Sequence, residues 1–428
     1  MQKGTDKFSV TLILVSRIFR NFAAGLINIV FPYIVLTVLN QGSFTLGLIY
    51  TAALISTALL GLAIGFATDA SPKLTFVTAL ATLPISTLLL FVFSDSLLAA
   101  YVAAVVGGFS ASGSLASGGV GGFIQPIQST ITAGITSRRD RTFYYGLLSF
   151  LTGVSSAAGA LVAGLPSIND VMLLATITSS ASVIPALFVR IRQGRSSRTE
   201  GNAKSGGDSP RGTDAANPSQ EENTGDATHS HRRFGLKSAN IIGKFGLTGM
   251  INGFATGLIF PFLIPFFITY YGLARSEMGE FAFISGLIGA FALLLGPRLE
   301  HELGFLKGVV VTRGATAVLS LIFPFVPLLP VSLAIYFILP PLRVVAFPVV
   351  QTAMTDMVPR EELGRAFGIN QGARIGVASL GTSFAGYEFD QSSYGVPFVA
   401  YAAVMAANLY LYVRFFSGYR DPMRRKRE

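Results

Sequence analysis

Two arginines lie deep inside apolar stretches of the chain, where a charge is costly and therefore marks a candidate functional site. At 1.5 Å per residue, Arg343 lies about 18 Å from the start of its stretch and Arg374 roughly 13 Å from the start of the next. Both depths are close to the middle of a hydrocarbon core about 30 Å thick. Pro340 and Pro341 precede Arg343 and predict a bend in the helix beside it.

Two midplane cations predict an anionic ligand, because no carboxylate lies at the same depth. The nearest acid, Glu280, lies close to the outer end of its stretch. A structural pair between Arg343 and Glu280 is the alternative. A planar guanidinium binds a carboxylate or phosphate through two parallel hydrogen bonds, so an anion is the ligand class that these residues favour.

Amide side chains form a second group of candidates. Asn21, Gly25 and Asn28 are three or four residues apart, which places them on one face of a helix. Such a face can line a pore or pack against another helix through small residues. Glutamines offer both donors and acceptors and could bind neutral polar groups. The candidate substrate-binding residues are Asn28, Gln125, Gln128, Asn252, Arg343, Gln351, Gln371 and Arg374.

Several chemistries are missing from the sequence. Because there is no cysteine, disulfides, thiolate metal sites and cysteine nucleophiles are excluded. The three histidines, His229, His231 and His301, lie outside the apolar stretches, and no paired acids or Ser–His arrangement is visible. We therefore expect no catalytic residue, metal or cofactor. Uniport, anion exchange and coupling through a carboxylate near a helix end all remain open.

The composition indicates a bilayer rather than water as the main solvent. Charged residues are 13% of the chain and hydrophobic residues 51%, whereas soluble domains have about 25% charged residues. Polar breaks separate twelve apolar spans. The first has no short apolar core that ends in a small-residue cleavage site, so we expect it to stay in the mature protein. The expected spans are 12–38, 45–67, 74–93, 98–128, 142–164, 171–190, 241–268, 276–296, 308–326, 331–355, 366–387 and 396–416.

The two halves of the chain are an internal duplication. Asn-Phe-Ala-Ala-Gly-Leu-Ile at 21–27 recurs as Asn-Gly-Phe-Ala-Thr-Gly-Leu-Ile at 252–259, and each copy opens a long apolar half. Two homologous membrane halves that face each other are typical of secondary transporters, which bind substrate between them near the midplane. We expect an all-α polytopic membrane protein of twelve transmembrane helices in two pseudo-symmetric six-helix bundles.

The basic residues indicate the orientation in the membrane. If both termini are cytoplasmic, nearly every Lys and Arg between the spans faces the cytoplasm, and only Arg275 lies in an outer loop. The net charge of +10 therefore reflects topology, and we expect a multi-pass protein of the cytoplasmic membrane with lipid rather than nucleic acid around it. Arg17 and Arg20 are interpreted as membrane anchors that reach the headgroups.

A polar segment separates the halves. Residues 193–233 contain no Leu, Ile, Val or aromatic residue and cannot bury enough surface to fold. We therefore expect an N-terminal half at 1–190, a flexible cytoplasmic linker at 191–237 that acts as a tether, and a C-terminal half with a basic tail at 238–428.

Two charged loops resemble those of the major facilitator superfamily. The stretch 356–368 (Asp-Met-Val-Pro-Arg-Glu-Glu-Leu-Gly-Arg-Ala-Phe-Gly) resembles the superfamily's loop between helices ten and eleven, and 136–142 (Thr-Ser-Arg-Arg-Asp-Arg-Thr) resembles the loop between helices four and five. The resemblance covers almost the whole chain and implies twelve helices and no particular substrate. The loop between helices two and three departs from the superfamily's pattern, since only Gly65, Asp69 and a lone Lys73 remain of it.

A cytoplasmic gate is expected around Asp69. Placed at the end of the second span, this carboxylate can pair with nearby arginines or lie at the N-terminus of a neighbouring helix when the cytoplasmic side is shut. A solvated carboxylate that contributes under ~1 kcal/mol is the alternative. The candidate gate residues are Gly65, Asp69, Arg138, Arg139, Arg141, Gly296 and Glu300.

The glycine-rich run from Gly107 to Gly122 makes the fourth span about ten residues longer than the tenth. We expect it to be non-helical or sharply kinked within that run.

The sequence as a whole predicts a carrier that moves a small solute by alternating access. An organic anion is favoured by the midplane arginines. Export of hydrophobic drugs is the alternative within the carrier class, and a polytopic membrane enzyme is the alternative outside it. The expected partners are a small-molecule substrate, a coupling ion in some of the open mechanisms, and the bilayer, and we expect a monomer.

Overall fold

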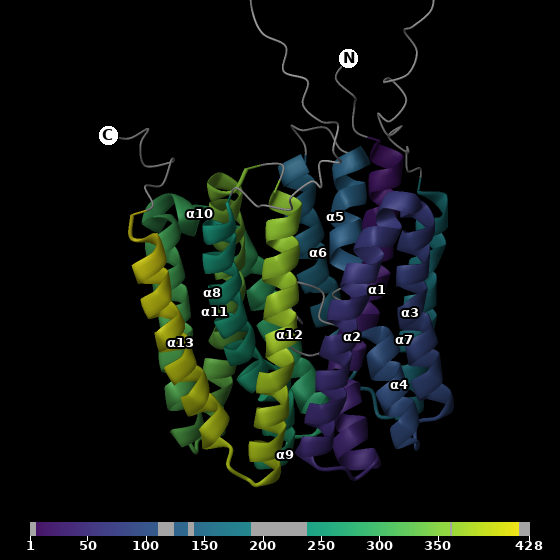
Figure 1. Ribbon diagram of the computed structural model, residues 1–428. Coiled ribbons are helices and arrows are strands. Elements are labelled where there is room, and N and C mark those ends of the chain that lie inside the picture. Colours follow the sequence, from purple (N-terminus) through teal and green to yellow (C-terminus); the bar gives the residue numbers. More distant parts are fainter. Residues whose placement is uncertain (1–5, 110–123, 136–140, 190–237, 360–361, 419–428) are drawn as a thin grey trace, which may run out of the picture.

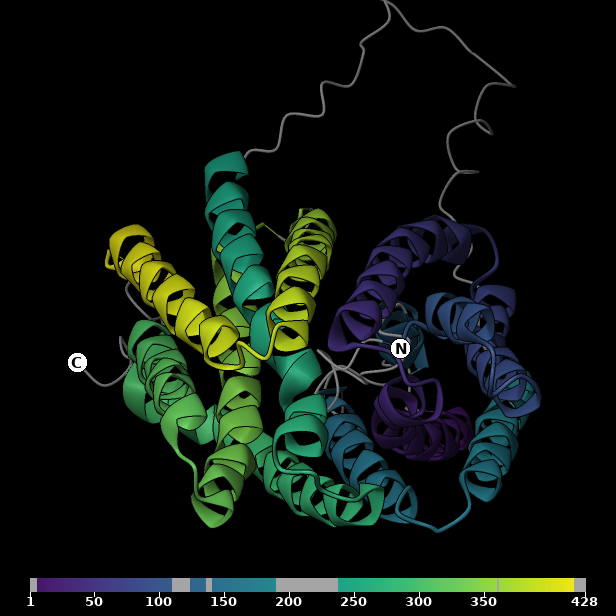
Figure 2. The ribbon, with the colours of Figure 1, turned by 90° about the horizontal axis from the view of Figure 1, so that it is seen from below.

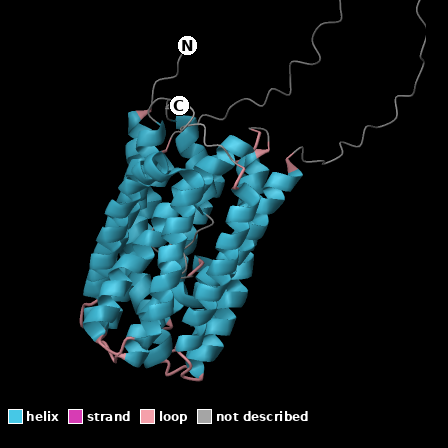
Figure 3. Ribbon diagram, turned by 90° about the vertical axis from the view of Figure 1, so that its left-hand side faces the viewer, coloured by secondary structure: helices cyan, strands magenta, loops and turns pink. Residues whose placement is uncertain are grey.

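The computed structural model describes residues 6–109, 124–135, 141–189, 238–359 and 362–418. In this part of the chain the elements are helices joined by loops, with no strand (Figure 3). The helices before residue 190 are α1 (Lys7–Tyr33) with its π-helical extension η1 (Ile34–Val38), α2 (Ser43–Ala70), α3 (Pro72–Val92), α4 (Leu97–Gly107), α5 (Ile124–Ile135), α6 (Arg141–Val162) and α7 (Ile168–Phe188).

The second half follows the same plan. Its helices are α8 (Ala239–Ile259), the short turn η3 (Phe260–Phe262), α9 (Leu263–Tyr270), α10 (Arg275–Ile322), the turn η4 (Phe323–Phe325), α11 (Leu329–Met357), α12 (Leu363–Asp390) and α13 (Gly395–Phe416). The backbone of α10 is not helical at Gly304, where φ is +73°. This glycine divides α10 into two spans that run in opposite directions, in agreement with the separate spans expected at 276–296 and 308–326.

The helices are built for a bilayer. Among the described residues, nine helical segments are long and apolar enough to cross a membrane, and Leu97–Gly107 and Gly146–Val162 are shorter apolar helices. Large apolar side chains are exposed on the outside of the bundle, such as Leu98 at 73% and Phe325 at 69%. Exposure of such a surface to water would be unfavourable, whereas in a bilayer these side chains contact the apolar lipid tails. The all-α membrane fold is confirmed, and the count of twelve helices stays a prediction.

Helix four is interrupted as the glycine-rich run predicts. α4 ends at Gly107, and Gly108 has a left-handed backbone with φ of +63°, a conformation that costs glycine little and other residues more. The predicted break is confirmed at Gly108. The rest of the run, 110–123, lies outside the described residues.

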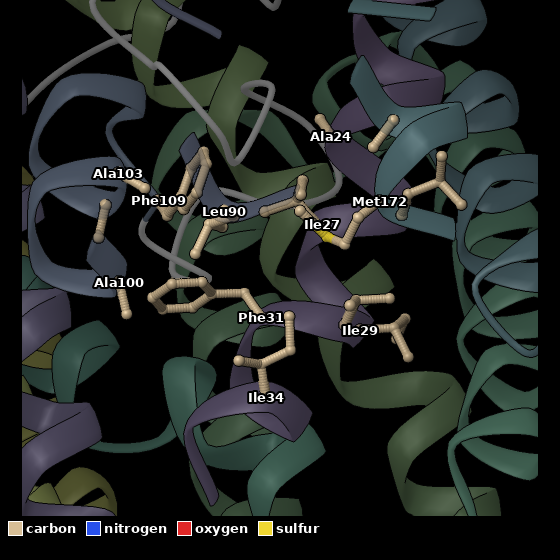
Figure 4. Packing of buried hydrophobic residues seen from close by; sticks show 14 of the residues in the cluster. Ala24, Ile27, Ile29, Phe31, Ile34, Leu90, Ala100, Ala103, Phe109 and Met172 are labelled. Atoms are coloured by element: carbon tan, nitrogen blue, oxygen red, sulfur yellow. The ribbon is translucent and has the colours of Figure 1, made fainter. Parts of the chain in front are cut away.

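The two halves of the chain form two groups of helices side by side. In Figures 1 and 2 the helices α1–α7 (purple to blue) lie together, and α8–α13 (teal to yellow) lie beside them. We call the face at which α1 begins and α13 ends the terminal face. Each group has its own core. The first includes Phe31, which contacts Tyr50 and lies beside Phe109 (Figure 4). The second includes Phe266, whose ring lies 5.0 Å from that of Phe323.

The halves touch near the face opposite to the terminal face. There α2 packs against α12, and a Cβ atom at Gly386 would lie only 3.0 Å from the Cα of Gly47. Thr51 in α2 donates a hydrogen bond to the carbonyl oxygen of Ser379 at 3.0 Å, and its hydroxyl lies 2.7 Å from that of Ser383 in α12. These close contacts hold the opposite face shut.

The same helix α12 stands apart from the first half nearer the terminal face. A Cβ atom at Gly372 or Gly376 would meet no described atom within 4 Å. Gly146, near the terminal end of α6, has the same open surroundings, whereas a Cβ at Gly153, two turns further along, would lie 2.7 Å from that of Ala290 in α10. The space between the halves therefore opens toward the terminal face.

Candidate functional site

A cavity of about 100 Å³ lies between the two halves. The first half contributes small or neutral residues from α1 and α6, among them Gly25, Asn28 and Ser156. The second half contributes residues from η3 and from all of its helices, α8 to α13. Its polar lining residues are Asn252, Thr256, Arg313, Thr316, Tyr336, Arg343, Arg374 and Tyr401.

Arg343 reaches the cavity from α11, three residues after Pro340, which also lines it. The helix is continuous through Pro340 and Pro341, so the predicted bend stays a prediction. Its guanidinium carbon lies 4.3 Å from the centre of the Phe260 ring, a distance at which the face of an aromatic ring attracts a cation. The exposed Glu280 is not among the lining residues, so the structure does not support the pair that the sequence left open.

Arg374 enters the cavity from α12. Its Nη2 donates a hydrogen bond of 3.0 Å to Oε1 of Gln371, one turn earlier on the same helix. Its positive charge is close enough to be repelled by those of Arg343 and Arg313. Like charges in a medium of low dielectric constant repel strongly, so the fold holds these groups together at a cost.

Arg313 is a third cation in the cavity, and the sequence analysis missed it. Its Nη1 donates to Oδ1 of Asn408 at 2.8 Å, and Nδ2 of Asn408 donates to the carbonyl oxygen of Thr248 at 2.8 Å. Its guanidinium carbon also lies 4.7 Å from the centre of the Tyr412 ring. These contacts from α8 and α13 hold Arg313 in place.

Aromatic residues form the apolar part of the wall. Phe260, Tyr336 and Tyr401 all line the cavity. The Tyr401 hydroxyl donates to Oγ1 of Thr316 at 3.2 Å, and this tyrosine lies near both Arg313 and Arg343. A ligand in the cavity would therefore meet cations and aromatic faces together.

The charge of the cavity is positive and comes from one half. Among the lining residues that the structure describes, three are arginines, all from the second half, and none is acidic. Charges at membrane depth are expensive and are kept where they bind or move a charged species. The arrangement can hold an anion by charge-assisted hydrogen bonds from more than one guanidinium.

Four of the predicted substrate-binding residues, Asn28, Asn252, Arg343 and Arg374, line this one cavity. Gln371 lies beside it through its hydrogen bond to Arg374. Gln351 is exposed in the last turns of α11 and does not line the cavity. The side chain of Gln125 lies outside the described residues.

Gln128 is part of a separate buried network in the first half. Its Oε1 accepts a 2.8 Å hydrogen bond from Nη1 of Arg17, whose Nε donates to Oγ1 of Thr152 at 2.5 Å. Arg17 is only 9% exposed and Arg20 only 7%. The interpretation of these arginines as membrane anchors is therefore wrong, because burial among α1, α5 and α6 keeps them from the headgroups. Arg17 instead joins α1 to α5 and α6.

The residues of the predicted gate lie outside the described part of the structure. This applies to the surroundings of Gly65 and Gly296, to the side chains of Asp69, Arg141 and Glu300, and to the whole of Arg138 and Arg139. The gate around Asp69 stays a prediction.

The sequence matches the family model of the Major Facilitator Superfamily over residues 13–344. Because this match covers more than half of the chain, the chain belongs to that superfamily. It is therefore a membrane transporter and not an enzyme. No curated protein matches the sequence.

Solved transporters share the fold at low identity. The crystal structure of the human organic anion transporter MFSD10 (TETRAN) is 13% identical with a TM-score of 0.65, over 96% of this chain and 100% of that one. The nucleoside transporter NupG, in a mutant form, is 11% identical with a TM-score of 0.69, over 96% and 100%. A D-xylose–proton symporter is 12% identical with a TM-score of 0.64, over 94% and 96%. At this identity the likeness concerns the fold alone.

Proposed function

We propose that the protein transports a small organic anion by alternating access, with the anion held in the cavity between the halves. The observation that carries the proposal is the convergence of Arg313, Arg343 and Arg374 on one cavity whose described lining contains no acid. Asn28 and Asn252 line the same cavity from the two halves and can donate hydrogen bonds to the bound anion. The human structural neighbour named as an organic anion transporter fits this class.

The proposal is tested by ligand stabilisation, because a ligand that binds only the folded state raises the melting temperature. Purified protein is melted with organic anions, sugars and hydrophobic cations, and each stabilising compound is then tested for transport in proteoliposomes. Organic anions should stabilise the protein and be transported. Stabilisation and transport of hydrophobic cations alone would instead favour drug export, the alternative supported by the aromatic wall of Phe260, Tyr336 and Tyr401.

The proposed orientation places the terminal face in the cytoplasm and the protein, as a monomer, in the cytoplasmic membrane. The asymmetry of Lys and Arg supports it. In this orientation the described structure is open to the cytoplasm and shut on the outside. Because the native chain has no cysteine, single cysteines can report each face without background.

We expect Gln391→Cys and Lys7→Cys to label from opposite sides of the membrane. Gln391 is exposed in the turn after α12, and Lys7 is exposed at the start of α1. In intact cells an impermeant thiol reagent should modify the cysteine at 391 and leave the one at 7 unmodified until the membrane is opened with detergent. The reverse pattern would show that the proposed orientation is inverted.

Arg275 is expected to stabilise the closed outer face by hydrogen bonds between the two halves. It starts α10 in the second half, is only 7% exposed, and its Nη2 donates to the carbonyl oxygens of Leu165 at 2.5 Å and Pro166 at 3.0 Å in the first half. Its guanidinium also lies 5.5 Å from the ring centre of Tyr33. Hydrogen bonds from a charged group contribute about 1.5–3 kcal/mol. Arg275→Met should therefore populate the outward-open state.

The measurement for this prediction is the labelling of a cysteine introduced at Ser156, which lines the cavity. In the Arg275→Met background, an impermeant reagent outside the cell should label this cysteine several-fold faster. Arg414→Met is the matched control, since Arg414 is exposed at the end of α13. Equal labelling rates in the two backgrounds would show that Arg275 does not hold the outer face shut.

A further inference from the structure

We infer that the transported anion is a small dianion, with two negative charges that engage two different guanidiniums. This inference rests on the proposed function and deepens it. It starts from the separate anchoring of the three cavity arginines. Arg343, Arg374 and Arg313 come from three different helical segments: α11, α12 and the part of α10 after Gly304.

Each guanidinium has its own fixed contact in the wall. Arg343 faces the ring of Phe260, Arg374 donates to Gln371, and Arg313 donates to Asn408 and faces Tyr412. Since their anchors differ, the three cannot swing together around one small charged group without losing these contacts. A single carboxylate bound by the planar fork of one arginine would leave the other charges of the cavity without a counter-charge from the ligand.

The mutual repulsion of the arginines also favours a ligand with two negative charges. Arg374 is repelled by both Arg343 and Arg313, and the described lining of the cavity carries three positive charges and no negative one. Because three guanidiniums line the cavity, the Coulomb attraction between the site and a ligand grows with the negative charge of the ligand. The site therefore discriminates by ligand charge.

The division of the lining between the halves sets the shape of the ligand. Among the described lining residues, all the charge lies in the second half, while the first half offers Asn28, Ser156 and apolar residues. The two anionic groups therefore bind the second half, and the middle of the molecule faces Asn28 and Ser156. Both a short dicarboxylate and a phosphate monoester carry this chemistry.

The test compares ligands of equal size and different charge on the purified full-length protein. Glutarate is matched with glutaramate, in which one carboxylate is replaced by a neutral amide, and ethyl phosphate is matched with the monoanion ethyl methylphosphonate, in which a methyl group replaces one charged oxygen. Dissociation constants are obtained from the rise in melting temperature with ligand concentration. We expect at least one dianion to bind about tenfold or more tightly than its monoanionic partner, which is about 1.4 kcal/mol. The pair with the larger ratio identifies carboxylate or phosphate as the preferred group.

The Arg374→Gln variant makes the test specific for two arginines. It should weaken dianion binding about tenfold more than monoanion binding, so that the preference disappears; Arg343→Gln should lower the ratio in the same way if Arg374→Gln does not fold. Equal affinity of wild-type protein for both members of each pair, with binding of organic anions retained, would overturn the dianion inference and leave the proposed function standing. If neither charge class binds and neither is transported, the proposed function itself fails.

Discussion

Replacement of Arg343 by methionine is expected to abolish anion transport while the protein stays folded. Removal of one partner from a buried, hydrogen-bonded charge pair costs about 2–5 kcal/mol, which corresponds to a loss of roughly 30-fold or more in affinity. The thioether is well tolerated among the apolar residues beside Phe260. Loss of the charge also relieves the repulsion from Arg374, so the melting temperature without ligand should not fall.

The measurements are uptake of labelled anion into proteoliposomes and the melting temperature of the same preparation. Arg343→Lys is the informative companion, because it keeps the charge and loses the planar fork that binds two oxygens at once. It should retain weak transport, between that of the wild type and that of Arg343→Met. The exposed Arg414→Met serves as the control for the loss of an arginine elsewhere. Undiminished uptake by Arg343→Met would remove this residue from the site.

Gly386→Leu is expected to reduce transport because it prevents closure of the outer face, not because it weakens anion binding. A Cβ atom at this position would lie 3.0 Å from the Cα of Gly47 and 3.0 Å from the carbonyl oxygen of Ser43. Both atoms belong to the backbone of α2 and cannot move aside alone, so a leucine must push the halves apart on the outer face. Leucine favours the helix over glycine, so α12 itself should persist. Transport should fall by about tenfold or more, equivalent to at least about 1.4 kcal/mol on the transport cycle.

The matched control is Gly314→Leu, where the nearest described atom to an added Cβ is Cδ1 of Leu409 at 3.8 Å. In Gly386→Leu, a cysteine at Ser156 should also become accessible to an impermeant reagent from the outside. Normal transport together with an unlabelled cysteine would show that the contact of Gly47 with Gly386 is not required for closure of the outer face.

The sequence predicted much of the fold because the bilayer imposes simple rules on length and hydropathy. The duplicated segment ends just before Asn28 in the first copy and begins at Asn252 in the second. The two copies lie in helices that both line the cavity. The depths of Arg343 and Arg374 were also sufficient to single them out, since a charge in the middle of an apolar span has few alternative explanations.

Other parts of the site depend on which helix faces which neighbour, and sequence patterns do not show this. Arg313 was not among the predicted residues, and it lies only five residues into the span expected at 308–326. The second segment of α10 follows Gly304 directly, so Arg313 is deeper than expected. Gly304, which lies in the loop expected between the two spans, was the sequence signal that could have placed the start of the second span earlier and Arg313 deeper in it. Gln128 was predicted to bind substrate, but it lies inside the first half, where its Oε1 accepts a hydrogen bond from Arg17.

The most direct test of the central claim is the location of a bound anion by anomalous X-ray diffraction. Crystals of the protein are grown with bromosuccinate, a dicarboxylate whose bromine gives a signal that water and lipid lack. A bromine peak in the cavity, between Asn28 of the first half and the guanidiniums of Arg343 and Arg374, is the result that the account predicts. Proteoliposomes that transport bromosuccinate, together with crystals whose bromine peak lies outside this cavity, would contradict it.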